Sequence, residues 1–317
     1  MRIVLEEITV VNVIAVIMMA FILRCRRKNR ESIHTEDKIY DAMAAICLIG
    51  ALAEMASYWL DGRLIVGGIF LNYLANSISF GGTVILGFLW CFYTDLRIYK
   101  NYERSMKHAK VLIIPLLIET VALIYNSFGT GLMFTISETN VYQRSAGNFI
   151  AYVCVLFYFA ESMALVRKSK NRGFNVTYFP IFYFIGPCLL GAAVQFFVYG
   201  ITASWISVAI AITFVQMQAY SENIYIDELS GLFNRRYLNG ILSKKVFLSK
   251  RSVHGIMLDV NDFKKINDTL GHNVGDRAIR TIGEILFRSI PEEGRAIRYA
   301  GDEFIILLIG ADSEKVF

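Results

Sequence analysis

Acidic side chains near the C-terminal end of the chain stand where they could do chemistry. Asp259 closes the short apolar run 253–260, which has the pattern of a buried strand. Asp302 and Glu303 occupy the turn of a predicted hairpin. If the strands are neighbours, the carboxylates converge, and hard divalent cations bind such oxygens together with substrate phosphates. The pattern favours metal-assisted phosphoryl transfer, although separated acids taken alone also fit solvated turn residues.

The elements that must position these acids alternate between strands and helices. The segment after Gly231 has the patterning of a compact α/β unit. We expect strands at 253–260, 295–299 and 304–309, and helices at 234–246, 263–270 and 274–290. Pro291 and Gly294 separate the last helix from the hairpin.

The residues around the acids resemble three motifs of GGDEF domains. Residues 227–236 read DELSGLFNRR, which is similar to the opening DxLTGLxNRR signature with Ser230 in place of threonine. Residues 259–276 contain DVNDFKKIND and GHNVGD, which resemble the central segment of the family. Residues 298–304 read RYAGDEF, similar to RYGGDEF. The order and spacing are specific, and the resemblance implies an α+β domain of nucleotidyl-cyclase type.

The resemblance implies a diguanylate cyclase, which condenses two GTP molecules into cyclic di-GMP and two pyrophosphates. It also implies a homodimer through this domain and the helix that precedes it. By the resemblance, Asp259, the Val260 carbonyl and Asp302 would bind Mg²⁺ or Mn²⁺. Asp302 or Glu303 would help to deprotonate the attacking 3′-hydroxyl.

The resemblance also implies the residues that hold GTP. Asn267 and Asp276 would bind the guanine edge. Phe263 and Lys264 would contact phosphates, partly through backbone N–H groups. Gly301 would let the backbone approach the nucleotide closely.

Several residues depart from the family pattern. Ala300 replaces the first glycine of the GGDEF motif, which would crowd the turn if its φ were positive. Asn261 replaces an acid beside the implied metal ligands. Residues 291–294 read PEEG where the family's inhibitory RxxD motif would stand, so this form of product inhibition is expected to be absent.

The family's domain continues beyond the hairpin. We therefore expect residues 221–317 to form a GGDEF domain that is incomplete at its C-terminus, and residues 1–317 alone to have little or no activity. The alternative is a non-catalytic receptor that binds nucleotide or a partner without turnover, but the presence of Asp302 and Glu303 favours the enzyme. A transporter or channel is disfavoured by the nucleotide motifs.

The composition predicts a membrane part before this domain. The chain of 317 residues is 55% hydrophobic and 19% charged, with a net charge of +5, which excludes a disordered chain and a basic nucleic-acid-binding protein. Charged residues are sparse through Tyr220 and dense from Ser221 onwards. We therefore expect a transmembrane sensor domain at 1–220. The five cysteines form no CxxC pair, and we expect neither a disulfide framework nor a zinc site.

Apolar runs of membrane-spanning length predict an all-α polytopic bundle of about seven helices in contact with membrane lipid. The predicted spans are 8–23, 39–60, 74–94, 111–128, 149–166, 178–199 and 201–217. Basic residues gather in the loops 24–38, 95–110 and 167–177, which the positive-inside rule assigns to the cytosol. All three loops share one side only if the run 64–94 crosses once. The N-terminus would then lie outside a bacterial cytoplasmic membrane, with the GGDEF domain in the cytosol.

Polar residues within the predicted spans are candidates for a ligand site. Glu54, Glu119 and Glu161 lie within spans, where a carboxylate is costly and usually faces the bundle interior. The alternative is that each is protonated or satisfied by a neighbouring polar side chain. Trp205 is expected in an interfacial aromatic belt. No Pro or Gly interrupts 201–229, so we expect one continuous helix from the membrane towards the C-terminal domain.

Overall fold

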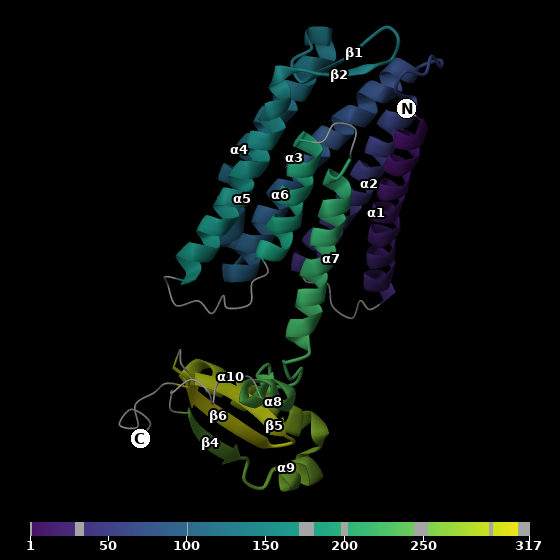
Figure 1. Ribbon diagram of the computed structural model, residues 1–317. Coiled ribbons are helices and arrows are strands. Elements are labelled where there is room, and N and C mark those ends of the chain that lie inside the picture. The colour runs from purple at the N-terminus through teal and green to yellow at the C-terminus, as the bar shows by residue number, and fades with distance from the viewer. Residues whose placement is uncertain are drawn as a thin grey trace. The chain divides into compact units, whose positions relative to one another are not determined.

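The protein is described by a computed structural model that covers residues 2–28, 35–99, 101–170, 181–197, 202–243, 253–291 and 294–309. The chain divides into two compact units, Met1–Gln216 and Met217–Phe317. The first consists mainly of helices and the second contains a sheet with helices (Figure 1). Each unit has its own hydrophobic core.

Long helices build the first unit. In the described residues these are α1 (Arg2–Lys28), α2 (Thr35–Leu60), α3 (Gly68–Tyr99), α4 (Tyr102–Tyr125), α5 (Phe149–Lys170), α6 (Ile181–Phe197) and α7 (Ser204–Asn223). A π-helical segment, Asn126–Thr130, follows α4, and a short 3-10 helix, Ala146–Asn148, precedes α5. The helix α3 runs through Gly81-Gly82 without a break, so this glycine pair does not divide the run.

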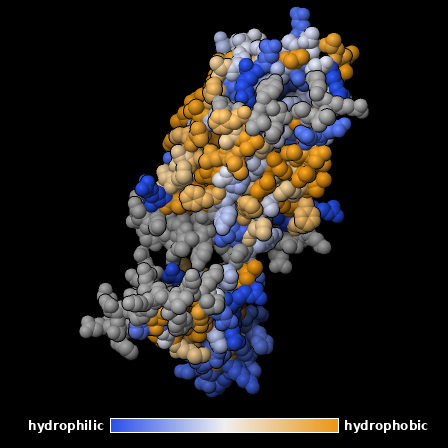
Figure 2. Space-filling model, viewed as in Figure 1, coloured by the Kyte–Doolittle hydropathy of each residue, from blue (hydrophilic) through white to orange (hydrophobic). Residues whose placement is uncertain are grey.

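The apolar helices support a membrane location. By length and composition, five helices among the described residues could cross a membrane: Leu5–Arg26, Thr35–Leu60, Gly68–Tyr99, Tyr102–Thr130 and Ala146–Ser169. The apolar helices Ile181–Gln195 and Ser204–Tyr220 are shorter, so seven spans remain a prediction. Hydrophobic residues cover much of the visible surface of this unit (Figure 2), as a lipid-facing surface requires.

Aromatic packing holds the helices of the first unit together. Trp90 of α3 stacks on Phe184 of α6 with ring centroids 3.8 Å apart. Trp205 of α7 is only 2% exposed, and a Cβ on Gly50 of α2 would lie 2.1 Å from its ring. The expectation that Trp205 lies in an interfacial belt is therefore wrong. The absence of a side chain at Gly50 lets the indole pack against α2 inside the bundle.

A small two-stranded sheet between α4 and α5 was not predicted. Strand β1 (Phe134–Ile136) pairs antiparallel with β2 (Tyr142–Arg144). Between them, Asn140 adopts a left-handed conformation with φ of 59°, and its side-chain amide donates to the carbonyls of Leu60 and Arg63 at 2.8 and 2.9 Å. These bonds attach the connection to the turn between α2 and α3.

A mixed sheet forms the centre of the second unit. Its elements are β3 (Phe233–Asn234), α8 (Arg235–Ser243), β4 (Val253–Asp259), α9 (Phe263–Leu270), α10 (His272–Ser289), β5 (Gly294–Ala300) and β6 (Glu303–Ile309). The strand order is β3-β5-β6-β4, with β3 parallel to β5 and the other pairs antiparallel. The predicted hairpin and the predicted helix 263–270 are confirmed.

The sheet buries side chains on both faces because residues alternate along each strand. One cluster, which includes α10, consists of Leu232, Ile279, Ala296 and Phe304. The other, which includes α8, consists of Tyr237, Leu238, Ile297 and Leu307. The neighbours Ala296 and Ile297 thus belong to opposite faces of β5.

The position of β4 differs from the prediction of a buried strand. The strand itself is confirmed, but among the described residues it pairs only with β6 and forms one edge of the sheet. Ile256, Met257 and Leu258 are exposed. The apolar run therefore reflects the preference of its residues for a strand, and these side chains form an apolar surface. In the described residues no second strand or helix covers this surface.

The helix α7 ends earlier than predicted. It stops at Asn223, and Ile226 then forms an antiparallel bridge with Phe233. The side-chain amide of Asn234 donates to the carbonyls of Ile224 and Ile226 at 2.8 and 3.2 Å. The expectation of a helix continuing to about residue 229 is therefore wrong, because this backbone is bound to the sheet instead.

Candidate functional site

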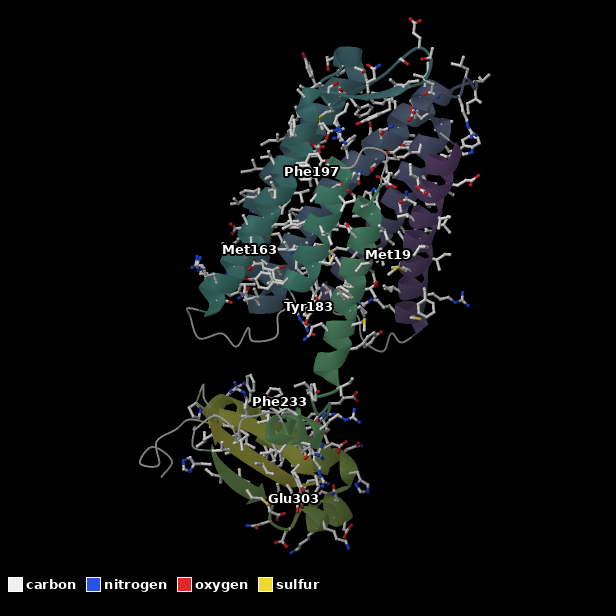
Figure 3. All side chains as sticks on the ribbon, in the orientation of Figure 1. Met19, Met163, Tyr183, Phe197, Phe233 and Glu303 are labelled. Carbon is white, nitrogen blue, oxygen red and sulfur yellow. The ribbon has the colours of Figure 1, made fainter. Side chains whose placement is uncertain are left out.

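The register of the sheet gathers the acids at one end of the second unit. Asp259, the last residue of β4, lies directly opposite Glu303, the first residue of β6. Asp302 occupies the turn immediately before Glu303. Residues opposite each other in an antiparallel ladder have Cα atoms about 4.5–5.5 Å apart. Figure 3 labels Glu303 at this end of the sheet, where β4 leads into α9.

The turn between β5 and β6 has room for the substitution at residue 300. Gly301 has φ of +30°, and a Cβ built there would meet nothing within 4 Å. Ala300 does not have a positive φ, since Asn140 and Asp262 are the only non-glycine residues with one in the described part of the chain. A register shift between Arg298 and Ala300 marks a bulge just before the turn, and bulges redirect side chains next to such sites. The backbone therefore accepts alanine at 300 without strain.

Arg298 connects this turn to the start of the domain. Its Nε donates to the carbonyl oxygen of Gly301 at 2.8 Å, and its Nη1 donates to Asp227 Oδ1 at 3.0 Å. The same oxygen of Asp227 accepts the N–H and the hydroxyl of Ser230 at 2.8 and 2.7 Å. Ser230 thus keeps the hydroxyl bond available to a threonine. We call these residues, Asp227, Ser230, Arg298 and Gly301, the Arg298 clamp.

The Arg298 clamp lowers the pKa of Asp227. Partial burial by itself would raise the pKa of this carboxyl, but the hydrogen bonds from Ser230 and the charge of Arg298 outweigh that effect. The Asp227 and Arg298 side chains are 25% and 15% exposed. The ion pair is therefore partly shielded from water, which strengthens it.

The predicted metal ligands offer oxygen atoms only. The Val260 carbonyl accepts the Phe263 N–H at 3.2 Å, and a carbonyl oxygen has a second lone pair. Within the described residues, no three His, Cys, Asp or Glu side chains form a metal centre by themselves. Two carboxylates and one carbonyl fit Mg²⁺ or Mn²⁺ when phosphates and water complete the coordination.

The two predicted guanine-binding residues lie at the contact between α9 and α10. Asn267 is on α9, and Asp276 is in the first turns of α10. Between them Gly275 is buried, and a Cβ there would lie 1.9 Å from Asn267 Oδ1. Glycine at 275 therefore allows the amide of Asn267 to lie beside the helix turn that carries Asp276. Sequence reasoning assigned no role to Gly275.

The predicted phosphate contacts lie at the start of α9. Lys264 is exposed in the first helical turn, where backbone N–H groups lack partners within the helix. The N–H of Phe263 points back to Val260 O. A phosphate that used this N–H would have to replace that bond.

Two further residues support the site without having been predicted to do so. Arg298 holds the hairpin turn, as described above. Asn234 caps α8, since its Oδ1 accepts the N–H groups of Arg236 and Tyr237 at 3.0 and 3.2 Å. Arg298 belongs to the RYAGDEF motif and Asn234 to the DELSGLFNRR motif. These motifs were the only sequence signal that could have pointed to either residue.

The three glutamates in the predicted spans have different surroundings. Glu54 is buried and bonded to Asn12 and Gln195. Glu119 is fully buried, and within the described structure neither of its carboxylate oxygens has a hydrogen-bond partner. Glu161 Oε1 lies 3.3 Å from Nε2 of His108. The structure does not bring the three into one site.

The family model described as "Diguanylate cyclase, GGDEF domain" matches residues 224–316. These residues form a GGDEF domain. The match begins just after α7 and includes all strands of the mixed sheet. The match also includes the acids at the end of the sheet, which are Asp259 at the end of β4, Asp302 in the turn before β6 and Glu303 at the start of β6.

Relatives of the GGDEF domain include diguanylate cyclases and a response regulator. The chain is 38% identical over 99 residues to diguanylate cyclase DgcS of Shewanella oneidensis, covering 30% of this chain and 33% of that protein. It is 38% identical over 85 residues to the response regulator PleD of Caulobacter vibrioides, covering 26% of this chain and 19% of that protein. The chain thus spans a third or less of the length of these relatives.

Among solved structures, the coiled coil and GGDEF domain of DgcB from Caulobacter crescentus, in complex with c-di-GMP, is similar. Its identity is 25% and its TM-score is 0.30, and the match covers 32% of this chain and 55% of that chain. The GGDEF domain of TpbB from Pseudomonas aeruginosa is 30% identical with a TM-score of 0.27, covering 29% of this chain and 55% of that chain.

Proposed function

We propose that the protein is a membrane-bound diguanylate cyclase. It condenses two GTP molecules into cyclic di-GMP and two pyrophosphates. Each 3′-hydroxyl attacks the α-phosphate of the other GTP, so two phosphodiester bonds form and two bonds to pyrophosphate break. The observation that carries the proposal is the pairing of Asp259 with Glu303 at the end of a sheet within a GGDEF domain.

The side chains at this end of the sheet divide the work. Asp259, the Val260 carbonyl and Asp302 would hold Mg²⁺ or Mn²⁺, which when bound offsets charge on the phosphates. Asp302 or Glu303 accepts the proton of the 3′-hydroxyl. The Arg298 clamp fixes the turn that carries both acids, because it bonds the carbonyl of Gly301.

The substrate would bind along α9 and the start of α10. Asn267 and Asp276 recognise guanine, since an amide and a carboxylate complement its acceptors and donors. Lys264 balances phosphate charge, and Phe263 lies against the same phosphates. Gly301 leaves open space above the turn for the nucleotide.

Two copies are needed for the reaction, because each GTP attacks the other. The proposed homodimer forms through the GGDEF domain and α7. The basic loops 24–38, 95–110 and 167–177 support a cytosolic location for the GGDEF domain and an outside location for the N-terminus. A sensor in the membrane would then act on the cyclase through α7.

A cyclase assay tests this proposal. A protein that carries a complete GGDEF domain should form cyclic di-GMP in detergent with Mg²⁺ and GTP, and Asp302→Ala should abolish the product, whereas residues 1–317 alone are expected to form little or none. Glu284→Ala is the matched control, because Glu284 is an exposed acid of α10 that pairs with Arg288 of the same helix. Cyclic di-GMP synthesis by Asp302→Ala would refute the mechanism. GTP binding without product in the unaltered protein with the complete GGDEF domain would favour the non-catalytic receptor.

A further inference from the structure

A buried polar cluster joins α1, α2, α6 and α7 in the first unit. Glu54 of α2 is 6% exposed. Its carboxylate accepts hydrogen bonds from Asn12 Nδ2 of α1 at 3.2 Å and from Gln195 Nε2 of α6 at 3.4 Å. The side-chain oxygen of Gln195 accepts the N–H and the hydroxyl of Ser204 at 3.0 and 2.5 Å. Gln195 thus connects a buried carboxylate to the first residue of α7.

The cluster lacks a positive charge. In the part of the chain that the structure describes, no basic side chain pairs with Glu54, and the donors that reach it are neutral amides. Asn12 is only 1% exposed, and its Oδ1 has no hydrogen-bond partner there. A buried carboxylate is costly unless its charge is paired. An unpartnered amide oxygen next to such a carboxylate favours a cation as the missing component.

The composition of the cluster limits the cation. Carboxylate and amide oxygens are hard ligands. One carboxylate compensates one positive charge, whereas a divalent ion would leave a buried net charge. Glu54 lies six residues before Leu60, the last residue of α2, which corresponds to about 9 Å along the helix. The cluster is therefore near the end of α2 where the connection to α3 begins.

Gln195 gives the cluster a way to act on α7. A cation at the carboxylate would repel the N–H group that Gln195 directs at Glu54. The Gln195 amide would then turn and change its bonds to Ser204. The next residue, Trp205, packs against Gly50, one turn before Glu54 on α2. A change at Gln195 would thus be felt where α7 is anchored in the bundle.

We propose that Glu54 and Asn12 form a binding site for a small monovalent cation, an alkali-metal ion or ammonium, and that Gln195 couples its occupancy to the start of α7. The site itself does not depend on the proposed membrane location. Entry of the ion from the outer side of the membrane does depend on it. The coupling gives the proposed cyclase an input from the surrounding ionic conditions.

Thermal unfolding in detergent tests the site without GTP. Na⁺, K⁺ and NH₄⁺ chlorides are compared with the chloride of the bulky cation N-methyl-D-glucamine at constant ionic strength. At least one small cation should raise the unfolding midpoint saturably, by about 2–4 °C. The rise should disappear in Glu54→Gln and persist in Glu119→Gln, which removes another buried carboxylate of the same unit.

A second readout follows the coupling and covers the case in which Glu54→Gln does not fold. The cation should change tryptophan emission, and Trp205→Phe should remove that change. Asn12→Ala should weaken cation affinity at least tenfold, and Gln195→Ala should keep the midpoint rise but lose the emission change. No rise with any small cation, or an equal rise in Glu54→Gln or Asn12→Ala, overturns the site. A midpoint that responds to pH but not to cations also overturns it. The unfolding and emission measurements contain no GTP. A failed cyclase assay would therefore not change what they say about the cation site.

Discussion

The Arg298 clamp links the start of the GGDEF domain to the turn between β5 and β6. Replacing Arg298 with glutamine removes the ion pair with Asp227 and the bond to the Gly301 carbonyl. Hydrogen bonds to charged groups contribute about 1.5–3 kcal/mol when shielded, and exposed pairs contribute under about 1 kcal/mol. With the two side chains 15% and 25% exposed, we expect a loss of about 1–2 kcal/mol.

Hydrogen exchange at the hairpin measures this loss locally. A loss of 1–2 kcal/mol corresponds to about 5–30-fold more frequent opening, so peptides containing residues 298–304 should exchange faster by that factor in Arg298→Gln. Because the acids must be in place for phosphoryl transfer, the same 1–2 kcal/mol should lower cyclic di-GMP synthesis by about 5–30-fold.

The matched control is Arg288→Gln, because Arg288 pairs with Glu284 at 3.9 Å on an exposed helix face. This variant should exchange and react like the unaltered protein. A double-mutant cycle with Asp227→Asn should give a coupling energy of about 1 kcal/mol. Unchanged exchange at the hairpin in Arg298→Gln would refute the argument that this clamp holds the turn.

Two further perturbations follow from the same unit. Gly275→Ala should raise the KM for GTP at least about fivefold, because the new Cβ would meet Asn267 Oδ1 at 1.9 Å and moving the amide would cost about 1–3 kcal/mol. An unchanged KM would mean that this amide does not bind guanine. Acid should destabilise the start of the GGDEF domain. The pKa of Asp227 is lowered on folding, so the ionised side chain stabilises the folded domain above the usual carboxyl pKa. This stabilisation is lost as the pH falls through the lowered pKa. Asp227→Asn should remove that pH dependence from exchange at residues 227–232, and an identical acid profile in the variant would contradict it.

Local patterns made much of the GGDEF domain predictable. The apolar run before Asp259 and the acidic turn at Asp302 predicted the strand and the hairpin, because period and turn chemistry are properties of short segments. The bounds of helix 263–270 also followed from its pattern. The burial of β4 was predicted wrongly, since an apolar strand has the same sequence at an edge as in the middle of a sheet.

Sequence alone therefore predicted which residues carry the chemistry and determined which segments are apolar enough to enter a membrane. The tertiary structure decided which of them meet. The register that sets Asp259 opposite Glu303, the reach of Arg298 from Asp227 to Gly301, and the bonds from Gln195 to Glu54 and Ser204 all join residues from different elements. Such contacts depend on how elements pack, because the energy of a long-range pair is spread over both partners and neither segment's own pattern records it.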